Sequence, residues 1–140
     1  MEPFSIKLEL RIDWSELDLF GHVNNLSIQK YIQSAKINYL EKIGLMQSQS
    51  DIEIGPTLVS STCQFRKMLF YPGNVTIYSN VDLIKTTSFR MHHKVMNDQN
   101  ELIAEAHDII VLFDFVKNHK HTIPDEIKRK ITELENYTRP

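Results

Sequence analysis

The first segment of the chain alternates apolar and polar residues. The apolar side chains there are Ile6, Leu8, Leu10 and Ile12, and the charged residues Lys7, Glu9 and Arg11 stand between them. A period of two is typical of a strand with one buried face. The sequence therefore predicts a strand that begins at Ser5 and ends at Asp13.

A helical pattern follows an irregular segment. Residues 14–25 show no period and end in Asn24 and Asn25, a residue type that favours the start of a helix. From residue 26 to 43, apolar residues recur at intervals of three and four, namely Ile28, Tyr31, Ile32, Ala35, Tyr39 and Ile43. This spacing predicts a helix with one apolar face, and Gly44 is a natural place for it to end.

The second half of the chain returns to a period of two. We interpret Gly55 and Pro56 as a break that precedes the next strand, and we place turns at residues 71–74 and 97–100. The alternation predicts four strands, at residues 59–66, 75–83, 87–96 and 102–115.

A short helix is predicted at the carboxyl end. Thr122 and Asp125 have the spacing of a capping box, and Ile127, Ile131 and Leu134 form a short apolar face. The order of elements is strand, long helix, four strands and a closing helix. This order predicts an α+β fold, with one antiparallel sheet folded about one helix.

Composition narrows the class of protein. With 140 residues, of which 41% are hydrophobic and 24% charged, the chain fits one globular domain over residues 1–140. The 16 basic and 18 acidic residues leave a net charge of -2, so nucleic acid and anionic membranes are not expected partners. The single cysteine, Cys63, excludes an internal disulfide and a multi-cysteine metal site. Without an apolar run of about 20 residues, we expect a cytoplasmic location.

Acidic residues gather just ahead of the long helix. Asp13, Glu16 and Asp18 fall within six residues of one another. The first N–H groups of a helix have no partner within it and carry a partial positive charge. A carboxylate next to such N–H groups suits acyl chemistry, because the N–H groups stabilise an oxyanion while the carboxylate attacks a carbonyl or activates water. Acids at this position also serve as simple helix caps, so spacing alone leaves both readings open.

The segment that starts at Asp18 carries a resemblance to a known family. Residues 18–25 read Asp-Leu-Phe-Gly-His-Val-Asn-Asn, and the helix that follows carries Ala35-Lys36-Ile37-Asn38-Tyr39-Leu40. This segment resembles the acyl-CoA thioesterases of the hotdog superfamily, in the hydroxybenzoyl-CoA thioesterase-like branch. Similar matches run through Tyr71-Pro72-Gly73-Asn74 to Ile123-Pro124-Asp125, so the resemblance spans nearly the whole chain.

The resemblance implies a fold, an assembly and a substrate. The expected fold is a long central helix wrapped by a curved antiparallel five-stranded sheet. Relatives of this kind form homodimers through sheet edges, often homotetramers, with the active site at the dimer interface. The implied substrate is an acyl-CoA, whose coenzyme A belongs to the substrate, and no metal or redox cofactor is expected.

Site residues follow from the resemblance position by position. Asp18 matches the catalytic carboxylate, acting as nucleophile or as general base, and Asn25 matches the residue whose backbone N–H faces the thioester oxygen. Gly21 permits a close approach of backbone to substrate. His22 and Asn24 are expected to shape the loop or to donate hydrogen bonds.

Further substrate-binding residues are expected outside the motif. Basic side chains near strand ends are candidates for the coenzyme phosphates, chiefly Arg66, Lys67 and Arg90, and Ser88 is placed beside the pantetheine channel by the resemblance. Two positions depart from the family pattern: Ile28 replaces a frequent tyrosine and Gln33 a frequent glutamate. These departures leave a non-catalytic acyl-CoA-binding protein open as an alternative, and a thioesterase for acyl carrier protein is a second.

The histidines give no expectation of a metal site. His92 and His93 are adjacent on a predicted strand and so project to opposite faces of the sheet. His119 and His121 form a pair without further ligand types nearby in the sequence.

Overall fold

The computed structural model describes residue 4 and residues 6–45 and 53–138. Ser5, where the first strand was predicted to begin, lies outside the described residues. The elements along the chain are β1 (Ile6–Arg11), the 3-10 helix η1 (Trp14–Glu16), α1 (Asn25–Lys42), β2 (Ile54–Phe65), β3 (Asn74–Ile84), β4 (Ser88–Met96), β5 (Leu102–Asp114), β6 (His119–Lys120) and α2 (Asp125–Thr138). None of the described helices has the length and apolar character needed to cross a membrane.

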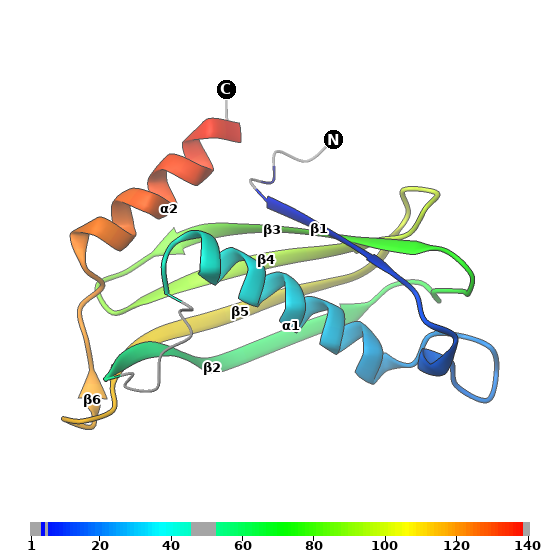
Figure 1. Ribbon diagram of the computed structural model, residues 1–140, viewed down its shortest axis with the longest axis horizontal. Helices are drawn as coiled ribbons and strands as arrows, with labels where there is room; N and C mark the ends of the chain where they lie inside the picture. Colours follow the sequence, from blue (N-terminus) through cyan, green and yellow to red (C-terminus); the bar gives the residue numbers. More distant parts are fainter. Residues whose placement is uncertain (1–3, 5, 46–52, 139–140) are drawn as a thin grey trace.

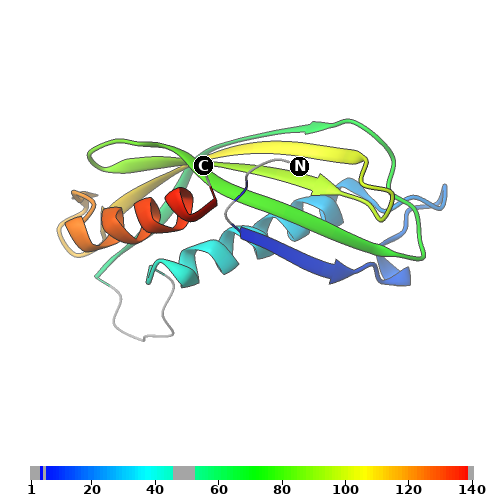
Figure 2. The same ribbon diagram turned by 90° about the horizontal axis from the view of Figure 1, so that it is seen from above.

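One antiparallel sheet forms the framework of the molecule. Its strand order is β1-β3-β4-β5-β2, and the two-residue β6 pairs with β5. Both helices lie on the same side of the sheet, with α1 running across it (Figures 1 and 2). This arrangement confirms the predicted hotdog fold, a curved antiparallel sheet around one long helix with a shorter carboxyl-terminal helix.

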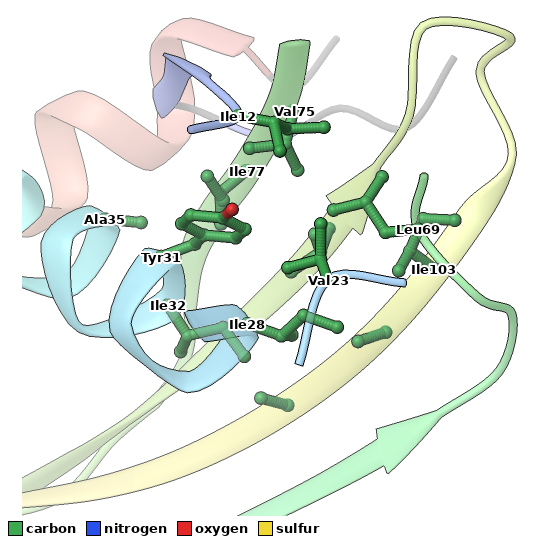
Figure 3. Packing of buried hydrophobic residues seen from close by; sticks show 13 residues of the cluster. Ile12, Val23, Ile28, Tyr31, Ile32, Ala35, Leu69, Val75, Ile77 and Ile103 are labelled. Carbon is green, nitrogen blue, oxygen red and sulfur yellow. The ribbon is translucent and has the colours of Figure 1, made fainter. Parts of the chain in front are cut away.

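The apolar face predicted for the long helix packs against the sheet. Ile28, Tyr31, Ile32 and Ala35 join a core cluster with β3 and β5 residues such as Ile77 and Ile103 (Figure 3). Farther along α1, Tyr39, Leu40 and Ile43 join a second cluster that also contains Ile123, Ile127 and Ile131. Burial of these side chains, at about 1.5–3 kcal/mol each, holds both helices on the sheet.

The carboxyl-terminal helix covers part of the β3 edge that β1 leaves unpaired. Pairing of β1 with β3 stops at Ile6 and Ser79, so the rest of that edge has no neighbouring strand. The buried carboxylate of Glu135 in α2 accepts a hydrogen bond from the Val81 backbone N–H at 3.1 Å and one from the Tyr39 hydroxyl at 2.5 Å. Glu135 therefore links α2 to both the sheet and α1.

The prediction for the segment around Gly55 and Pro56 is wrong. These residues do not precede a strand but lie inside β2, where they pair with Phe113 and Leu112 of β5. A proline is tolerated there because β2 is the outermost strand on that side, and its missing N–H can face away from the ladder. The 3-10 helix η1 and the strand β6 were also not predicted.

Candidate active site

Asp18 begins a tight turn in the loop before α1. The Gly21 N–H donates to the Asp18 carbonyl oxygen at 3.2 Å, and Gly21 has a φ of +84°, a conformation that favours glycine. One carboxylate oxygen of Asp18, Oδ1, accepts the backbone N–H groups of Phe20 at 2.8 Å and His22 at 3.1 Å. The carboxylate is therefore fixed by the backbone of the four residues that follow it.

The turn keeps Asp18 ionised. Desolvation opposes ionisation, but the Phe20 and His22 N–H groups and the nearby His22 ring outweigh it, so the pKa of Asp18 lies below its ordinary value. A carboxylate in this state can attack a carbonyl or accept a proton from water at neutral pH.

His22 anchors the loop to the segment before β3. Its Nδ1 lies 3.5 Å from Asp18 Oδ2, and its ring packs edge-on against Phe70, with 5.6 Å between ring centroids. The next residue, Val23, donates its N–H to the Leu69 carbonyl oxygen at 2.8 Å. These contacts favour the loop-shaping role expected for His22.

Asn24 fixes the start of α1. Its Oδ1 accepts the Ser27 N–H at 2.7 Å as the helix N-cap, while its Nδ2 donates to the Glu16 carbonyl oxygen at 2.9 Å. The helix therefore begins at Asn25, whose backbone N–H is among the first four and has no acceptor within the helix.

The other two acids of the loop have local partners. Asp13 caps η1 by accepting the Ser15 N–H at 3.0 Å. Glu16 accepts the Asp13 N–H at 2.9 Å and the Tyr31 hydroxyl at 2.5 Å, and burial together with this carboxylate raises the pKa of Tyr31. Asp18, in contrast, lines a pocket.

Asp18 and Asn25 line the same pocket, of about 380 Å³. His22 and Ile28 contribute to its wall from the same loop and helix, while Arg66 and Lys67 contribute from the segment after β2. Arg66 Nη2 lies 3.7 Å from Glu105 Oε1, and Lys67 pairs with Glu101, so an acid orients each basic side chain. Both basic side chains are exposed. The fold thus brings together most of the residues predicted for the site. Among the described residues, no three metal-ligating side chains converge on this pocket.

Ser88 and Arg90 lie elsewhere in the chain. Ser88 pairs with Val111, seven residues along β5 from Ala104, which pairs with Phe65 at the pocket. At about 3.3 Å per residue, the separation is roughly 23 Å. Arg90 binds Asp82 through Nε at 2.8 Å. A contribution of either residue to substrate binding within one chain has no support from this placement.

A second hollow of about 420 Å³ lies farther along the groove between α1 and β2. It is lined by Gln33 and Lys36 of α1 and by Ser61 and Asp108. Gln33, which departs from the family pattern, therefore lines this hollow and not the Asp18 pocket. The buried Lys36 Nζ is 3.1 Å from Asp108 Oδ2, and the Ser61 hydroxyl donates to Oδ1 at 2.7 Å.

Sequence reasoning missed this buried pair, although one signal was present. Asp108 occupies an inward position of β5 between Ala106 and Ile110, where alternation calls for an apolar residue. A charge at such a position indicates a buried partner.

A comparison with protein families gives a match over residues 12–131, to the model of the thioesterase-like superfamily. The chain belongs to this superfamily. The matched range includes the whole Asp18 loop and α1, so the pocket lies inside the part that the family shares.

Three individual proteins that resemble this chain share about a fifth to a quarter of the aligned residues with it. The protein YsmA of Bacillus subtilis, described as uncharacterized, is 24% identical over 98 residues, which are 70% of this chain and 65% of that protein's length. A solved gentisyl-coenzyme A thioesterase is 25% identical, covers 90% of this chain and 99% of its own, and has a TM-score of 0.78. A solved member from Jannaschia sp. CCS1 is 20% identical, covers 96% of this chain and 85% of its own, and has a TM-score of 0.85, which shows the fold.

Proposed function

We propose that this protein is an acyl-CoA thioesterase, which hydrolyses a thioester to a carboxylic acid and free coenzyme A. The observation that carries the proposal is the pocket lined by both the ionised Asp18 and the first residue of α1, Asn25. Membership of the thioesterase-like superfamily and the likeness to a gentisyl-coenzyme A thioesterase support the choice of a thioester substrate.

In the proposed reaction, Asp18 supplies the negative charge that starts the chemistry. Its carboxylate either attacks the thioester carbonyl carbon or takes a proton from the water that does so. The carbonyl oxygen becomes an oxyanion, which the Asn25 backbone N–H stabilises by a hydrogen bond. The C–S bond then breaks, and the thiolate sulfur takes up the proton that water loses. Where Asp18 acts as the base, the water oxygen has already bonded to the carbonyl carbon. Where Asp18 acts as the nucleophile, water then hydrolyses the mixed anhydride and returns the free carboxylate of Asp18.

Arg66 and Lys67 are proposed to bind the coenzyme phosphates. Both line the Asp18 pocket and both are exposed, so a phosphate can approach them from solvent. Charge-assisted hydrogen bonds to phosphate are about twice as strong as neutral ones.

We also propose that two copies pair through β2. This strand is outermost in the sheet and exposes Leu58, Val59 and Phe65, which are 46%, 57% and 43% accessible. An exposed apolar edge strand is a template for pairing with another strand. A homodimer is therefore the minimum assembly expected in solution, and a homotetramer would combine two of them.

The test is release of free thiol from short, medium, long-chain and aromatic acyl-CoAs. Asp18→Asn keeps an oxygen that can accept the turn N–H groups, yet it removes the charge, so turnover should fall by at least about 10²-fold. Asp13→Asn is the matched control, because it makes the same change at a carboxylate that caps η1 and does not line the pocket.

Undiminished turnover in folded Asp18→Asn would refute the proposed role of Asp18. Binding of coenzyme A without thiol release by the wild-type protein would instead support the non-catalytic acyl-CoA-binding alternative. Release from acyl carrier protein thioesters in preference to acyl-CoA would support the second alternative.

A further inference from the structure

The face of the sheet opposite α1 carries a pair of histidines. Along β4, Phe89, Met91, His93 and Val95 are buried on the side of the core. His92 alternates with them and so projects from the opposite face. Its direct partner across the ladder is His107 of β5, which therefore shares that face.

The two imidazole rings are stacked. Their centroids are 4.3 Å apart and the ring planes differ by 10°. Both residues are partly buried. This arrangement brings two imidazole nitrogen ligands to one place on two adjacent strands.

A β-bulge adds a carboxylate to the pair. The register of β3 and β4 shifts between Val81 and Leu83, which leaves Asp82 without a partner across the ladder. Bulges redirect the side chain of the extra residue. One ligand atom each from Asp82, His92 and His107 then lies within 4.8 Å of the others.

We propose that Asp82, His92 and His107 bind a divalent transition-metal ion with a preference for nitrogen ligands, such as Zn²⁺. Two imidazole nitrogens and one carboxylate oxygen form a common ligand set for such ions, with a fourth position left for water. The site is separate from the Asp18 pocket, because the two share no lining residue and lie on opposite sides of the sheet. The bound ion joins β3, β4 and β5.

Glu105 and Arg90 orient two of the three proposed ligands. Glu105 Oε2 lies 2.6 Å from His92 Nε2, and an ionised carboxylate can only accept, so Nε2 is the donor of this bond and Nδ1 is the ring nitrogen left for an ion. Arg90 holds Asp82 through Oδ1 at 2.8 Å and orients the third ligand.

Apart from the family resemblance, the expectation of no metal rested only on the neighbours of each histidine along the sequence. His93, the neighbour of His92 along the chain, faces the core and lies 2.7 Å from Ser79 Oγ. The partner that matters is His107, fifteen residues away in the sequence and directly opposite in the sheet.

The test is calorimetric titration with ZnCl₂ of the full chain after removal of metal by EDTA and dialysis. We expect one high-affinity Zn²⁺ ion per chain and no heat with MgCl₂, since Mg²⁺ prefers oxygen ligands. His107→Gln and Asp82→Asn should each weaken binding at least about 10-fold, and Glu105→Gln about 10-fold through the orientation of His92. The double variant His119→Gln/His121→Gln is the matched control and should bind as the wild type does.

Circular dichroism establishes that each variant is folded, and Asp82→Asn changes an exposed residue on the bulge if His107→Gln does not fold. The melting temperature of the wild type should rise with Zn²⁺ concentration, and that of Asp82→Asn should not. Absence of a stoichiometric Zn²⁺ ion in the wild type would overturn the proposal. Wild-type affinity for Zn²⁺ in both His107→Gln and Asp82→Asn would also overturn it. Asp18→Asn should bind Zn²⁺ normally, which separates this test from that of the thioesterase.

Discussion

Asp18 and Asp108 are both carboxylates with a lowered pKa, but different parts of the chain lower it. The Asp18 side chain is 34% accessible, and N–H groups within four residues along the chain stabilise its charge. The Asp108 side chain is 1% accessible, and it depends on side chains from other elements. Desolvation is the largest single effect on the pKa of Asp108, and it raises that pKa. His93 of β4, Ser61 of β2 and Lys36 of α1 together outweigh desolvation and lower the pKa to about 2.

Local hydrogen bonds stabilise the charge of Asp18, whereas contacts between separate elements stabilise the charge of Asp108. The hydrogen bonds that hold the Asp18 carboxylate come from the four residues after it, so its charge does not depend on packing between helix and sheet. The charge of Asp108 is tolerable only while helix and sheet are packed together. Changes at Asp108 should therefore affect folding, whereas changes at Asp18 should affect chemistry. The predictions below test this division.

The largest effect on stability is expected for Asp108→Ala. Removal of this carboxylate leaves the buried ammonium of Lys36 without its 3.1 Å partner, and breaking a buried ion pair costs about 3–5 kcal/mol. Urea unfolding measures the loss. The double variant Asp108→Ala/Lys36→Met should recover part of it, and equal stability of single and double variants would contradict the argument. Asp18→Asn should change the unfolding midpoint far less than Asp108→Ala does.

Acid should act on the same pair. The pKa of Asp108 is lowered to about 2 in the folded state, below the ordinary 3.8 of the unfolded chain. The stability from this group is therefore present above about pH 4 and is lost as pH falls toward 2, by about 2 kcal/mol. Urea unfolding at several values between pH 4.5 and 2.5 should show a flatter pH dependence in Asp108→Asn than in the wild type. An unchanged slope would rule out this role of Asp108.

The loop has its own tertiary contact, through Tyr31. Its hydroxyl donates to Glu16 Oε1 at 2.5 Å and ties α1 to η1. Tyr31→Phe should cost about 1.5 kcal/mol, because a hydrogen bond to a charged group is lost while Glu16 keeps the Asp13 N–H. Urea unfolding compares it with Tyr78→Phe, on the other face of the sheet, which should cost less. Equal costs would show that the contact between Tyr31 and Glu16 does not stabilise the fold.

The smallest effect is expected for Asn24→Ala. Loss of the N-cap should cost about 1 kcal/mol, and the Asn25 N–H should shift enough to slow thiol release. Asn24→Asp keeps the acceptor for the Ser27 N–H and should restore most of the stability. If Asn24→Ala slowed release while Asn24→Asp did not, the position of the helix start would be the cause.

The lowered pKa of Asp18 predicts how activity depends on pH. The pKa of Asp18 lies below its ordinary value, so its carboxylate is already ionised at pH 5 and stays so as pH rises. The profile of kcat/KM for thiol release should therefore show no inflection from Asp18 between pH 5 and 8. An inflection there that Asp18→Asn removes would contradict this expectation.

Hydrophobic periods and one short motif in the sequence predicted most of the elements and the loop before α1. Periods of two and of three to four predicted β1, α1 and the ladder strands, because an element with one buried face must repeat its apolar residues at its own period. The segment before α1 predicted a loop and the helix start, since the cap that begins the helix depends on hydrogen bonds within a few residues. Gly55 and Pro56 misled because the effect of proline depends on whether a strand is outermost, and strand order is not written in the sequence.

Only the tertiary structure decided which distant residues meet. Asp108 gains Lys36, Ser61 and His93 because four elements converge in the core, and His92 gains His107 because β4 and β5 pair in one register. The same register places Ser88 opposite Val111, seven residues along β5 from Ala104, whose partner Phe65 lines the Asp18 pocket. Local hydrogen bonds need only neighbouring residues, whereas these contacts depend on strand order and register, which packing of the whole chain sets.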